Sequence, residues 1–223
     1  INYSFALIRD GVLSAAELDK PDEIRLVKKR YPHLKVLVSV GGWGADGFSD
    51  AALTERSRAL FAESAVEFVR KNSFDGIDVD WEYPGSSDAG IKARPEDREN
   101  FTLLLKELRK VLDRCGAGDG KKYLLTAALG GTAYTLRFYD LKSISGLLDY
   151  VNLMTYDFTH GNSTETGHHT CLFAPAGKSG VPSADAAVKI CLDSGIPAEK
   201  LVLGCAFYGR GWDVTDGSSN GLH

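Results

Sequence analysis

The sequence lacks any long hydrophobic run and any large excess of charge. Charged or polar residues interrupt every apolar stretch before it reaches the roughly 18 residues that a membrane-spanning helix needs. The 26 basic residues stand against 30 acidic ones, so the formal net charge is −4, unlike the basic surface of a nucleic-acid clamp. We therefore expect no membrane and no nucleic-acid partner. The first residue is Ile1, and no targeting peptide follows it, which is compatible with a signal removed upstream.

Cysteine is scarce, and its spacing is wrong for zinc. No C-x₂-C pair occurs among the four cysteines, which are Cys115, Cys171, Cys191 and Cys205. Because structural zinc sites draw their ligands from such short pairs, we expect no metal. Four cysteines allow three disulfide connectivities, and a reduced, mostly buried set is an equally good interpretation.

Two matches to the N-glycosylation pattern favour secretion. They begin at Asn100 and Asn162, both of which we expect at the surface. A third match, at Asn2, falls in an expected strand and carries no weight. We therefore predict an extracellular location.

The composition is that of a globular domain, with 43% hydrophobic and 25% charged residues. Apolar β-type runs alternate with helical periods along the chain, which indicates an α/β fold. The open doubly wound sheet is the alternative, but no G-x-G-x-x-G loop follows the first strand. The expected strands are Ile1–Ile8, Lys35–Trp43, Gly76–Glu82, Tyr123–Gly131, Tyr150–Phe158 and Leu201–Trp212. Six βα units predict a TIM (β/α)₈ barrel with about six of its eight units in this chain.

Helical patterns fill the intervals between these strands. Ser14 with Glu17 forms a capping-box pattern that predicts a helix start, and Ser183 predicts a second start, for a helix that ends at Gly195. Two apolar stripes predict buried helix faces. Their members are Leu60, Phe61, Ala65, Phe68 and Val69 in one helix, and Phe101, Leu104, Leu105, Leu108, Val111 and Leu112 in another, after Pro95.

The most informative segment is 74–85. Side chains alternate along a strand, so Asp78, Asp80 and Glu82 point to one face. Same-face neighbours lie roughly 6.5 to 7 Å apart, and like charges that close in a low-dielectric interior favour retention of at least one proton. Glu82 is nearest the carboxyl end of the strand, where barrel enzymes bind substrate, so we expect it to act as a general acid with Asp80 as a second carboxylate. A hard-cation site is the chemical alternative.

This segment resembles the D-x-x-D-x-D-x-E signature of glycoside hydrolase family 18, the chitinases and their relatives. Asp75, Asp78, Asp80 and Glu82 fill its four acidic positions. Three further segments are similar to motifs of that family and occur in the same order. They are Ser39-Val40-Gly41-Gly42-Trp43 (S-x-G-G), Met154-Thr155-Tyr156-Asp157 (M-x-Y-D) and Tyr208-Gly209-Arg210 (Y-G-R). The resemblance covers essentially the whole chain.

The resemblance implies substrate-assisted hydrolysis of chitin or chito-oligosaccharides with retention and without a cofactor. Glu82 would be the general acid/base, Asp80 would orient the 2-acetamido group of the sugar, Asp78 would share a proton with Asp80, and Tyr156 would hydrogen-bond the acetamido carbonyl. The remaining motif positions imply two sets. Trp43, Gly42, Tyr83, Met154, Asp157, Tyr208 and Arg210 would bind substrate, and Asp75, Ser39 and Gly41 would be structural.

Compared with the family barrel, the first and eighth strands have no counterpart. We therefore expect residues 1–223 to form one incomplete catalytic domain, with 213–223 as the start of a small α+β insertion, and a monomer when full length. Three alternatives to a chitinase stay open: a chito-oligosaccharide-binding chitinase-like lectin, an endo-N-acetylglucosaminidase acting on N-glycans, and a metal-dependent hydrolase. His160, His168 and His169 are expected to be solvated loop residues.

Overall fold

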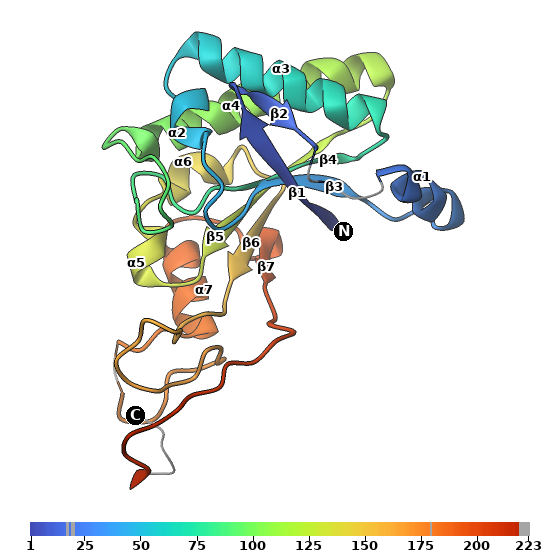
Figure 1. Cartoon of the computed structure of the whole chain (residues 1–223). Coiled ribbons are helices and arrows are strands. Elements are labelled where there is room, and N and C mark those ends of the chain that lie inside the picture. Colours follow the sequence, from blue (N-terminus) through green and yellow to red (C-terminus); the bar gives the residue numbers. More distant parts are fainter. Residues whose placement is uncertain (17, 19–20, 179, 219–223) are drawn as a thin grey trace.

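The computed structural model describes residues 1–16, 18, 21–178 and 180–218, and shows one seven-stranded sheet with helices packed against it (Figure 1). The strands are β1 (Asn2–Arg9), β2 (Val12–Ser14), β3 (Leu37–Gly41), β4 (Gly76–Asp80), β5 (Leu124–Gly130), β6 (Tyr150–Met154) and β7 (Leu201–Leu203). The helices are α1 (Pro21–Arg30), α2 (Phe48–Ala51), α3 (Glu55–Lys71), α4 (Asp97–Asp119), α5 (Ala133–Leu136), α6 (Leu141–Ser145), α7 (Ala184–Asp193) and the 3₁₀ turn η1 (Ala198–Lys200).

The strand order is β2-β1-β3-β4-β5-β6-β7, and all pairs from β1 to β7 are parallel. The predicted alternation of six parallel strands with helices is confirmed. β2 was not predicted. It pairs antiparallel with β1 through the two-residue turn Asp10-Gly11, in which both residues have positive φ. Asp-Gly between apolar residues is a strong signal for such a hairpin.

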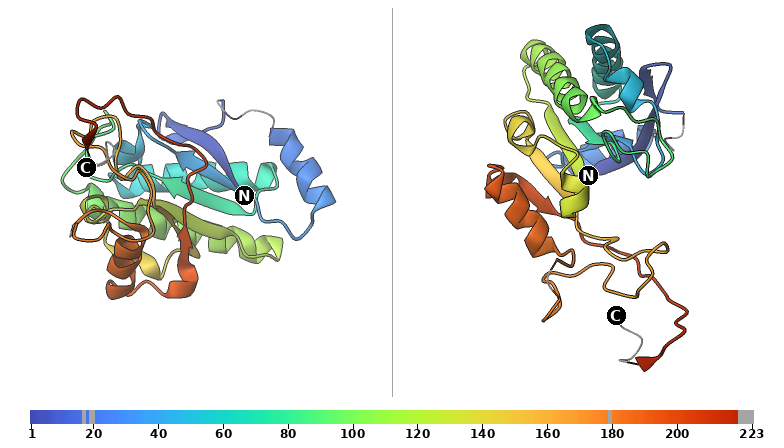
Figure 2. Two further views of the ribbon diagram at one scale, coloured as in Figure 1. Left: turned by 90° about the horizontal axis from the view of Figure 1, so that it is seen from below. Right: turned by 90° about the vertical axis from the view of Figure 1, so that its left-hand side faces the viewer.

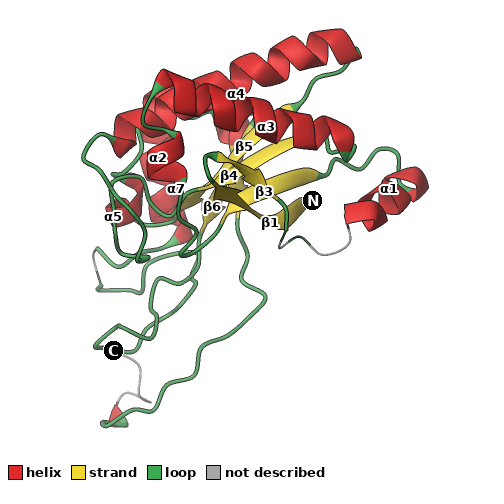
Figure 3. Ribbon diagram, turned by 45° about the horizontal axis from the view of Figure 1, so that its top comes forward, coloured by secondary structure: helices red, strands yellow, loops and turns green. Residues whose placement is uncertain are grey.

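The core lies between the sheet and the two long helices, α3 and α4, which lie side by side across it (Figure 3). All six apolar residues of the stripe in α4 are at most 1% exposed, as predicted. In α3, Phe61, Ala65 and Val69 are buried, but Leu60 is 50% exposed, so the expected face is wrong at its edge. Buried side chains of β3 and β4 complete the core from below these helices.

Several boundaries differ from the sequence prediction. Ser14 closes β2 and α1 begins at Pro21, so Ser14 does not cap that helix, and Glu17 lies outside the described residues. Strand pairing also ends earlier than predicted, because β6 stops at Met154 and β7 at Leu203. Ser183 does cap α7, and its side chain accepts a hydrogen bond from the N–H of Ala186.

The structure also tests the expectations for the cysteines, the glycosylation patterns and the C-terminal segment. All four cysteines are free, as the reduced interpretation expects, but only Cys191 is buried, so the expectation of a mostly buried set is wrong. Asn100 lies in α4 and is 7% exposed, so the expectation of a surface position there is wrong. Asn162 lies in an exposed loop. Residues 213–217 carry no helix or strand, Ser218 has 3₁₀ conformation, and the rest of the segment expected to begin an insertion lies outside the described residues.

Two long segments extend from the carboxyl edge of the sheet. The loop that follows β6 and the segment that follows β7 run together away from the strands (Figure 1, Figure 2). His169 and Tyr208 link them, with ring centroids 4.9 Å apart. The M-x-Y-D motif therefore begins at the end of β6, and the Y-G-R motif lies in the segment that follows the neighbouring strand β7.

Candidate active site

Asp78 and Asp80 lie on one face of β4 and Glu82 follows just beyond its end, whereas their apolar neighbours lie on the other face. Ile77, Val79 and Trp81 are at most 1% exposed and belong to the core beneath α3 and α4. Trp81 stacks on Phe48 with ring centroids 5.3 Å apart. Because the side chains of a strand alternate, this anchoring turns the acids toward the opposite face of the sheet.

Asp78 is the innermost acid, and its hydrogen-bond donors lie on three other strands of the sheet. Its Oδ2 accepts from Ser39 Oγ on β3 at 2.8 Å, and its Oδ1 accepts from Asn152 Nδ2 on β6 at 2.9 Å and from Thr126 Oγ1 on β5. Burial raises the pKa of Asp78, and the three donors partly offset this rise. Asp78 is therefore held at both of its oxygens by side chains of the sheet.

Asp80 is next along the strand and is 6% exposed. Its Oδ1 is buried and accepts no hydrogen bond from any described residue. Burial, followed by the charges of Glu82 and Asp78, raises the pKa of Asp80 well above its usual value. A buried acceptor without a donor is costly, so Asp80 is prepared to take a hydrogen bond from something that enters the site.

Glu82 lies just beyond the end of β4 and is more accessible than the two aspartates. Burial raises the pKa of Glu82, a hydrogen bond from Tyr83 partly lowers it, and the negative charge of Asp157 raises it further. Burial also raises the pKa of Tyr83, so this phenol stays protonated and able to donate. Tyr83 is fixed by Phe138, whose ring lies parallel to it with centroids 6.2 Å apart. These shifts are those of a carboxyl suited to proton donation.

The S-x-G-G-W segment lies at the neighbouring end of β3. Gly41 has φ 122°, and a Cβ there would lie 2.0 Å from Asp80 O, so only glycine fits beside the acid strand. The N–H of Gly42 donates to Asp80 O at 3.0 Å. Trp43 follows and is 64% exposed, with its ring at an edge contact 6.4 Å from Tyr83. Ser39 donates to Asp78 and so belongs directly to the acid cluster.

The M-x-Y-D segment follows β6. Tyr156 is half-buried, and burial, together with the charges of Asp80 and Glu82, raises the pKa of its phenol. Asp157 has φ 58°. Burial works to raise the pKa of Asp157, but hydrogen bonds from Arg210 and Tyr208 outweigh it, and the pKa is lowered. Met154 is half-buried as the last residue of β6.

The Y-G-R segment fastens Asp157 in place. Tyr208 Oη donates to Asp157 Oδ2 at 2.8 Å, and Arg210 Nε donates to Asp157 Oδ1 at 2.8 Å, with Arg210 Nη2 on the same oxygen. The rings of Tyr208 and Tyr156 form an edge contact with centroids 6.1 Å apart. The structure thus brings both motifs to the same edge of the sheet as the three acids.

Three residues at the site were not predicted to belong to it. Thr126 and Asn152 hold Asp78, and neither carries a local motif. His169, expected as a solvated loop residue, is instead largely buried, with its Nδ1 3.4 Å from the N–H nitrogen of Asp157 and its Nε2 3.1 Å from Tyr208 O. One predicted residue lies elsewhere. Asp75 stands at the amino end of β4, where it accepts from Val36 N at 2.8 Å and Lys28 Nζ at 2.7 Å.

The next question is whether the acids could hold a metal ion. Within the described ranges, no group of three histidine, cysteine, aspartate or glutamate side chains is arranged to hold a metal ion. The same part of the chain contains no helix of the length and apolar character needed to cross a membrane.

Buried acids at the carboxyl ends of parallel strands, with one raised-pKa glutamate outermost, are typical of a barrel-type glycoside hydrolase. Residues 1–222 match the family model described as glycosyl hydrolases family 18. The chain therefore belongs to glycoside hydrolase family 18, and its predicted α/β, TIM-barrel fold class is confirmed.

Relatives in this family carry chitinase names. The chain is 46% identical to chitinase A1 of Niallia circulans over 91% of the chain and 30% of that protein. It is 36% identical to chitotriosidase-1 of Mus musculus over 99% of the chain and 49% of that protein. The chain thus spans less than half the length of these curated relatives.

Solved structures agree closely with this fold. A family 18 N-acetylglucosaminidase from Paenibacillus barengoltzii superposes with a TM-score of 0.96 at 43% identity, covering 100% of this chain and 66% of that one. The chitinase domain of the spore coat protein CotE from Clostridium difficile gives a TM-score of 0.84 at 41% identity, over 93% of this chain and 59% of that one.

Proposed function

We propose that this chain carries the catalytic residues of a chitinase, which hydrolyses β-1,4-linked N-acetylglucosamine polymers with retention by substrate-assisted catalysis. The observation that carries the proposal is the line of Asp78, Asp80 and Glu82, whose pKa values are all raised while only the outermost acid is accessible. Membership of family 18 and the names of the relatives support the substrate class.

Glu82 is the general acid. Its carboxyl donates its proton to the glycosidic oxygen as the bond between that oxygen and the anomeric carbon breaks. The carbonyl oxygen of the substrate's 2-acetamido group attacks the anomeric carbon and forms an oxazolinium intermediate. Water then opens this ring from the face that the leaving group vacated, and the Glu82 carboxylate takes the proton of that water, so the configuration is retained.

Asp80 orients the nucleophile. Its unpartnered Oδ1 accepts a hydrogen bond from the acetamido N–H, and its charge stabilises the positive charge that develops on the oxazolinium ring. Asp78 shares a proton with Asp80, so the three acids together do not carry three negative charges. Tyr156 donates to the acetamido carbonyl, since its raised pKa keeps the phenol protonated.

The remaining motif residues bind sugar. Trp43 provides an exposed ring on which a sugar can stack. Gly42 has no side chain, so the sugar can approach the backbone closely at this position. Asp157, with Tyr208 and Arg210, offers hydrogen-bonding groups to sugar hydroxyls. Tyr83 and Met154, which are both half-buried, also contact the substrate. We further propose an endo-acting, extracellular enzyme that is monomeric when full length, with chitin or chito-oligosaccharide as its substrate.

Release of single N-acetylglucosamine units is the second candidate function, and the similarity to the Paenibacillus barengoltzii N-acetylglucosaminidase favours it. The presence of Glu82 argues against a chito-oligosaccharide-binding lectin, in which the acid is replaced. An endo-N-acetylglucosaminidase acting on N-glycans uses related acids, and the exposed Trp43 favours the chitinase over it.

The test is hydrolysis of a fluorogenic chitotrioside by the intact protein, by its Glu82→Gln variant and by wild type in EDTA. The Glu82→Gln variant should lose about 10²–10⁴-fold in kcat, because it cannot donate the proton, and EDTA should change nothing. The exposed Glu67→Gln is the matched control. Loss of activity in EDTA would point to the metal-dependent alternative. Binding without cleavage by wild type would point to the lectin, and analysis of product lengths separates endo action from release of single units.

A further inference from the structure

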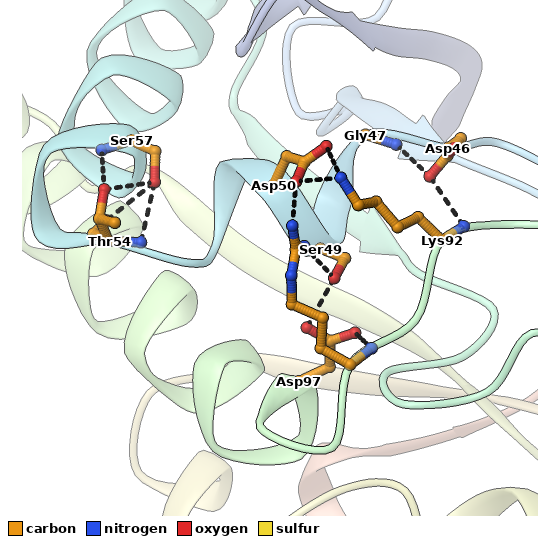
Figure 4. A network of polar contacts seen from close by, with 9 residues as sticks. Asp46, Gly47, Ser49, Asp50, Thr54, Ser57, Lys92 and Asp97 are labelled. Carbon is orange, nitrogen blue, oxygen red and sulfur yellow. Dashed lines mark hydrogen bonds and ion pairs between the residues drawn. The ribbon is translucent and has the colours of Figure 1, made fainter.

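A polar cluster joins the loop after β3 to the loop after β4 (Figure 4). Arg94 lies at its centre. Its Nη1 donates to Ser49 Oγ at 2.6 Å, its Nη2 donates to Asp50 Oδ1 at 2.5 Å, and its backbone N–H donates to Asp97 Oδ2 at 2.7 Å. Ser49 Oγ in turn donates to Asp97 Oδ1 at 2.9 Å. One arginine therefore ties α2 to the first residue of α4.

Lys92 extends the cluster toward β3. Its Nζ donates to both oxygens of Asp50, at 2.8 and 3.0 Å, and its backbone N–H donates to Asp46 Oδ1 at 3.2 Å. The same oxygen of Asp46 accepts from the N–H of Gly47 at 2.7 Å. Asp46 follows Trp43 closely in the chain, so the cluster reaches the loop that carries the exposed tryptophan.

The cluster is built in, unlike an ordinary pair of surface charges. Asp97 is 0% exposed and Ser49 is 1% exposed. A buried carboxylate is tolerated only when it is hydrogen-bonded, and both oxygens of Asp97 accept. Hydrogen bonds from Lys92 and Arg94 lower the pKa of Asp50. This carboxylate therefore stays ionised at a lower pH than an ordinary aspartate does.

Phe48 and Ala51 anchor helix α2 in the core, and this cluster binds its two polar residues. The helix has only four residues, and its N-cap, Gly47, lies in the left-handed region at φ 104° and supplies no side-chain cap. Helices far shorter than about 12 residues are not stable by themselves. The side chains of Ser49 and Asp50 within α2 are the ones that Arg94 binds, so the cluster and the core contacts of Phe48 together fix this helix and the loop before it.

The position of Trp43 depends on both loops. Trp43 belongs to the loop after β3, and the ring that contacts its edge, Tyr83, belongs to the loop after β4. Trp43 is 64% exposed, so the core does not fix the direction of its ring. Backbone hydrogen bonds from Gly42 to Asp80 and from Ala45 to Gly42 hold the main chain of Trp43, and what holds one loop against the other contributes to where its stacking face lies.

We propose that Arg94, through Ser49, Asp50 and Asp97, is a positioning residue that fixes the Trp43 ring as a sugar-stacking platform beside Glu82. This inference rests on the proposed function for its consequence in catalysis, but the placement of the ring can be measured without substrate. Arg94 touches no reacting atom and acts through the loop that carries Trp43.

The experiment compares Arg94→Gln with wild type on a long chito-oligosaccharide, using the intact protein. Arg94→Gln should raise KM about tenfold, equal to about 1.4 kcal/mol, while kcat stays within about twofold, because the acids are unchanged. In a Trp43→Ala background, Arg94→Gln should raise KM no further, since the residue it positions is gone. Unchanged KM in the single variant, or a full tenfold rise in the double variant, would overturn the proposal.

Arg114→Gln is the matched control. Arg114 Nη2 donates to both oxygens of Glu63 at 2.7 Å and links α4 to α3 at the exposed surface. Arg114→Gln removes a comparable ion pair but leaves the loops after β3 and β4 intact, so KM should not change. Arg94→Lys keeps the charge but not the fork that reaches Ser49 and Asp50 together, so its KM should fall between wild type and Arg94→Gln.

Fluorine NMR of the protein labelled with fluorotryptophan reads the ring directly. The sequence has three tryptophans, and the resonance of Trp43 is the one absent from Trp43→Ala. This resonance should shift or broaden in Arg94→Gln and stay unchanged in Arg114→Gln. An unchanged Trp43 resonance in a folded Arg94→Gln protein would overturn the inference whatever the activity, whereas wild-type inactivity on chito-oligosaccharides counts against the proposed function alone.

Discussion

Asp78 and Asp80 are same-face neighbours on β4, yet both oxygens of Asp78 accept hydrogen bonds whereas Oδ1 of Asp80 accepts none from the described residues. Burial raises the pKa of both. The fold therefore stabilises one acid and leaves the other in an unfavourable state. Groups kept at a cost to stability are typical of functional sites, and substrate would relieve this one.

Asp80→Asn should separate activity from stability. We expect kcat on a chito-oligosaccharide to fall by about 10²–10³-fold, because the developing positive charge loses its counter-charge. The melting temperature should rise, because an uncompensated buried charge is removed. Steady-state kinetics and thermal unfolding measure the two effects. The exposed Asp193→Asn should change neither, and an Asp80→Asn protein that keeps full activity would contradict the proposed role.

The stability gained by Asp80→Asn should depend on pH. Folding raises the pKa of Asp80 above 3.8, so the folded state binds this proton more tightly than the unfolded state. The contribution of Asp80 to stability is therefore fully present below pH 3.8 and is lost as the pH rises through the folded pKa. Denaturant unfolding of wild type and Asp80→Asn across this range should show that the difference in their unfolding free energies grows as the pH rises. A difference that shrinks as the pH rises would refute the raised pKa.

The hydrogen bond from Thr126 to Asp78 should make a clear contribution to the unfolding free energy. Thr126→Val leaves Asp78 Oδ1 with fewer donors in a buried site, and we expect a loss of about 1–3 kcal/mol in unfolding free energy. Thr102→Val is the matched control, because Thr102 is also buried but its Oγ1 has no partner among the described residues. That change should be neutral or stabilising. Equal losses in both variants would show that the hydrogen bond to Asp78 contributes nothing.

The sequence predicts the acid face of β4 well because the alternation of a strand is a local property. Asp78, Asp80 and Glu82 have the spacing of one face, and the structure turns that face away from the core. The hydrogen-bond partners of Asp78 are not local. Thr126 and Asn152 reach it only because β4, β5 and β6 pair in one register, and a single threonine or asparagine in a strand carries no pattern of its own.

Other differences have equally physical reasons. Asn100 matches a glycosylation pattern, but that pattern ignores the helix period, which places Asn100 on the buried face of α4. Ser14 and Glu17 have the spacing of a capping box, but the hairpin turn at Asp10-Gly11 draws Ser14 into β2. His169 becomes part of the site because tertiary contacts bring the segments after β6 and β7 together.

Asp157 should tune the acid. Burial is the main cause of the raised pKa of Glu82, and the charge of Asp157 adds to it. Asp157→Asn removes that charge, so the pKa of Glu82 should fall and the alkaline limb of the kcat profile should move to lower pH. The position of this limb is independent of any overall loss of activity from the broken contacts with Arg210 and Tyr208. Asp193→Asn should leave the limb in place, and an alkaline shift in Asp157→Asn would contradict the coupling.

Gly41 should tolerate no side chain. Its φ of 122° is unfavourable for any other residue, and a Cβ would lie 2.0 Å from the backbone oxygen of Asp80, which cannot move without displacing the acid strand. Gly41→Ala should therefore lower the unfolding free energy by about 3 kcal/mol or more. Gly118 in α4 is the control, since a Cβ there meets nothing within 4 Å and alanine should stabilise the helix by about 0.5–1 kcal/mol. Denaturant unfolding of both variants gives opposite signs if the contact with Asp80 makes glycine obligatory, and a mild loss in Gly41→Ala would show that β3 and β4 can separate there.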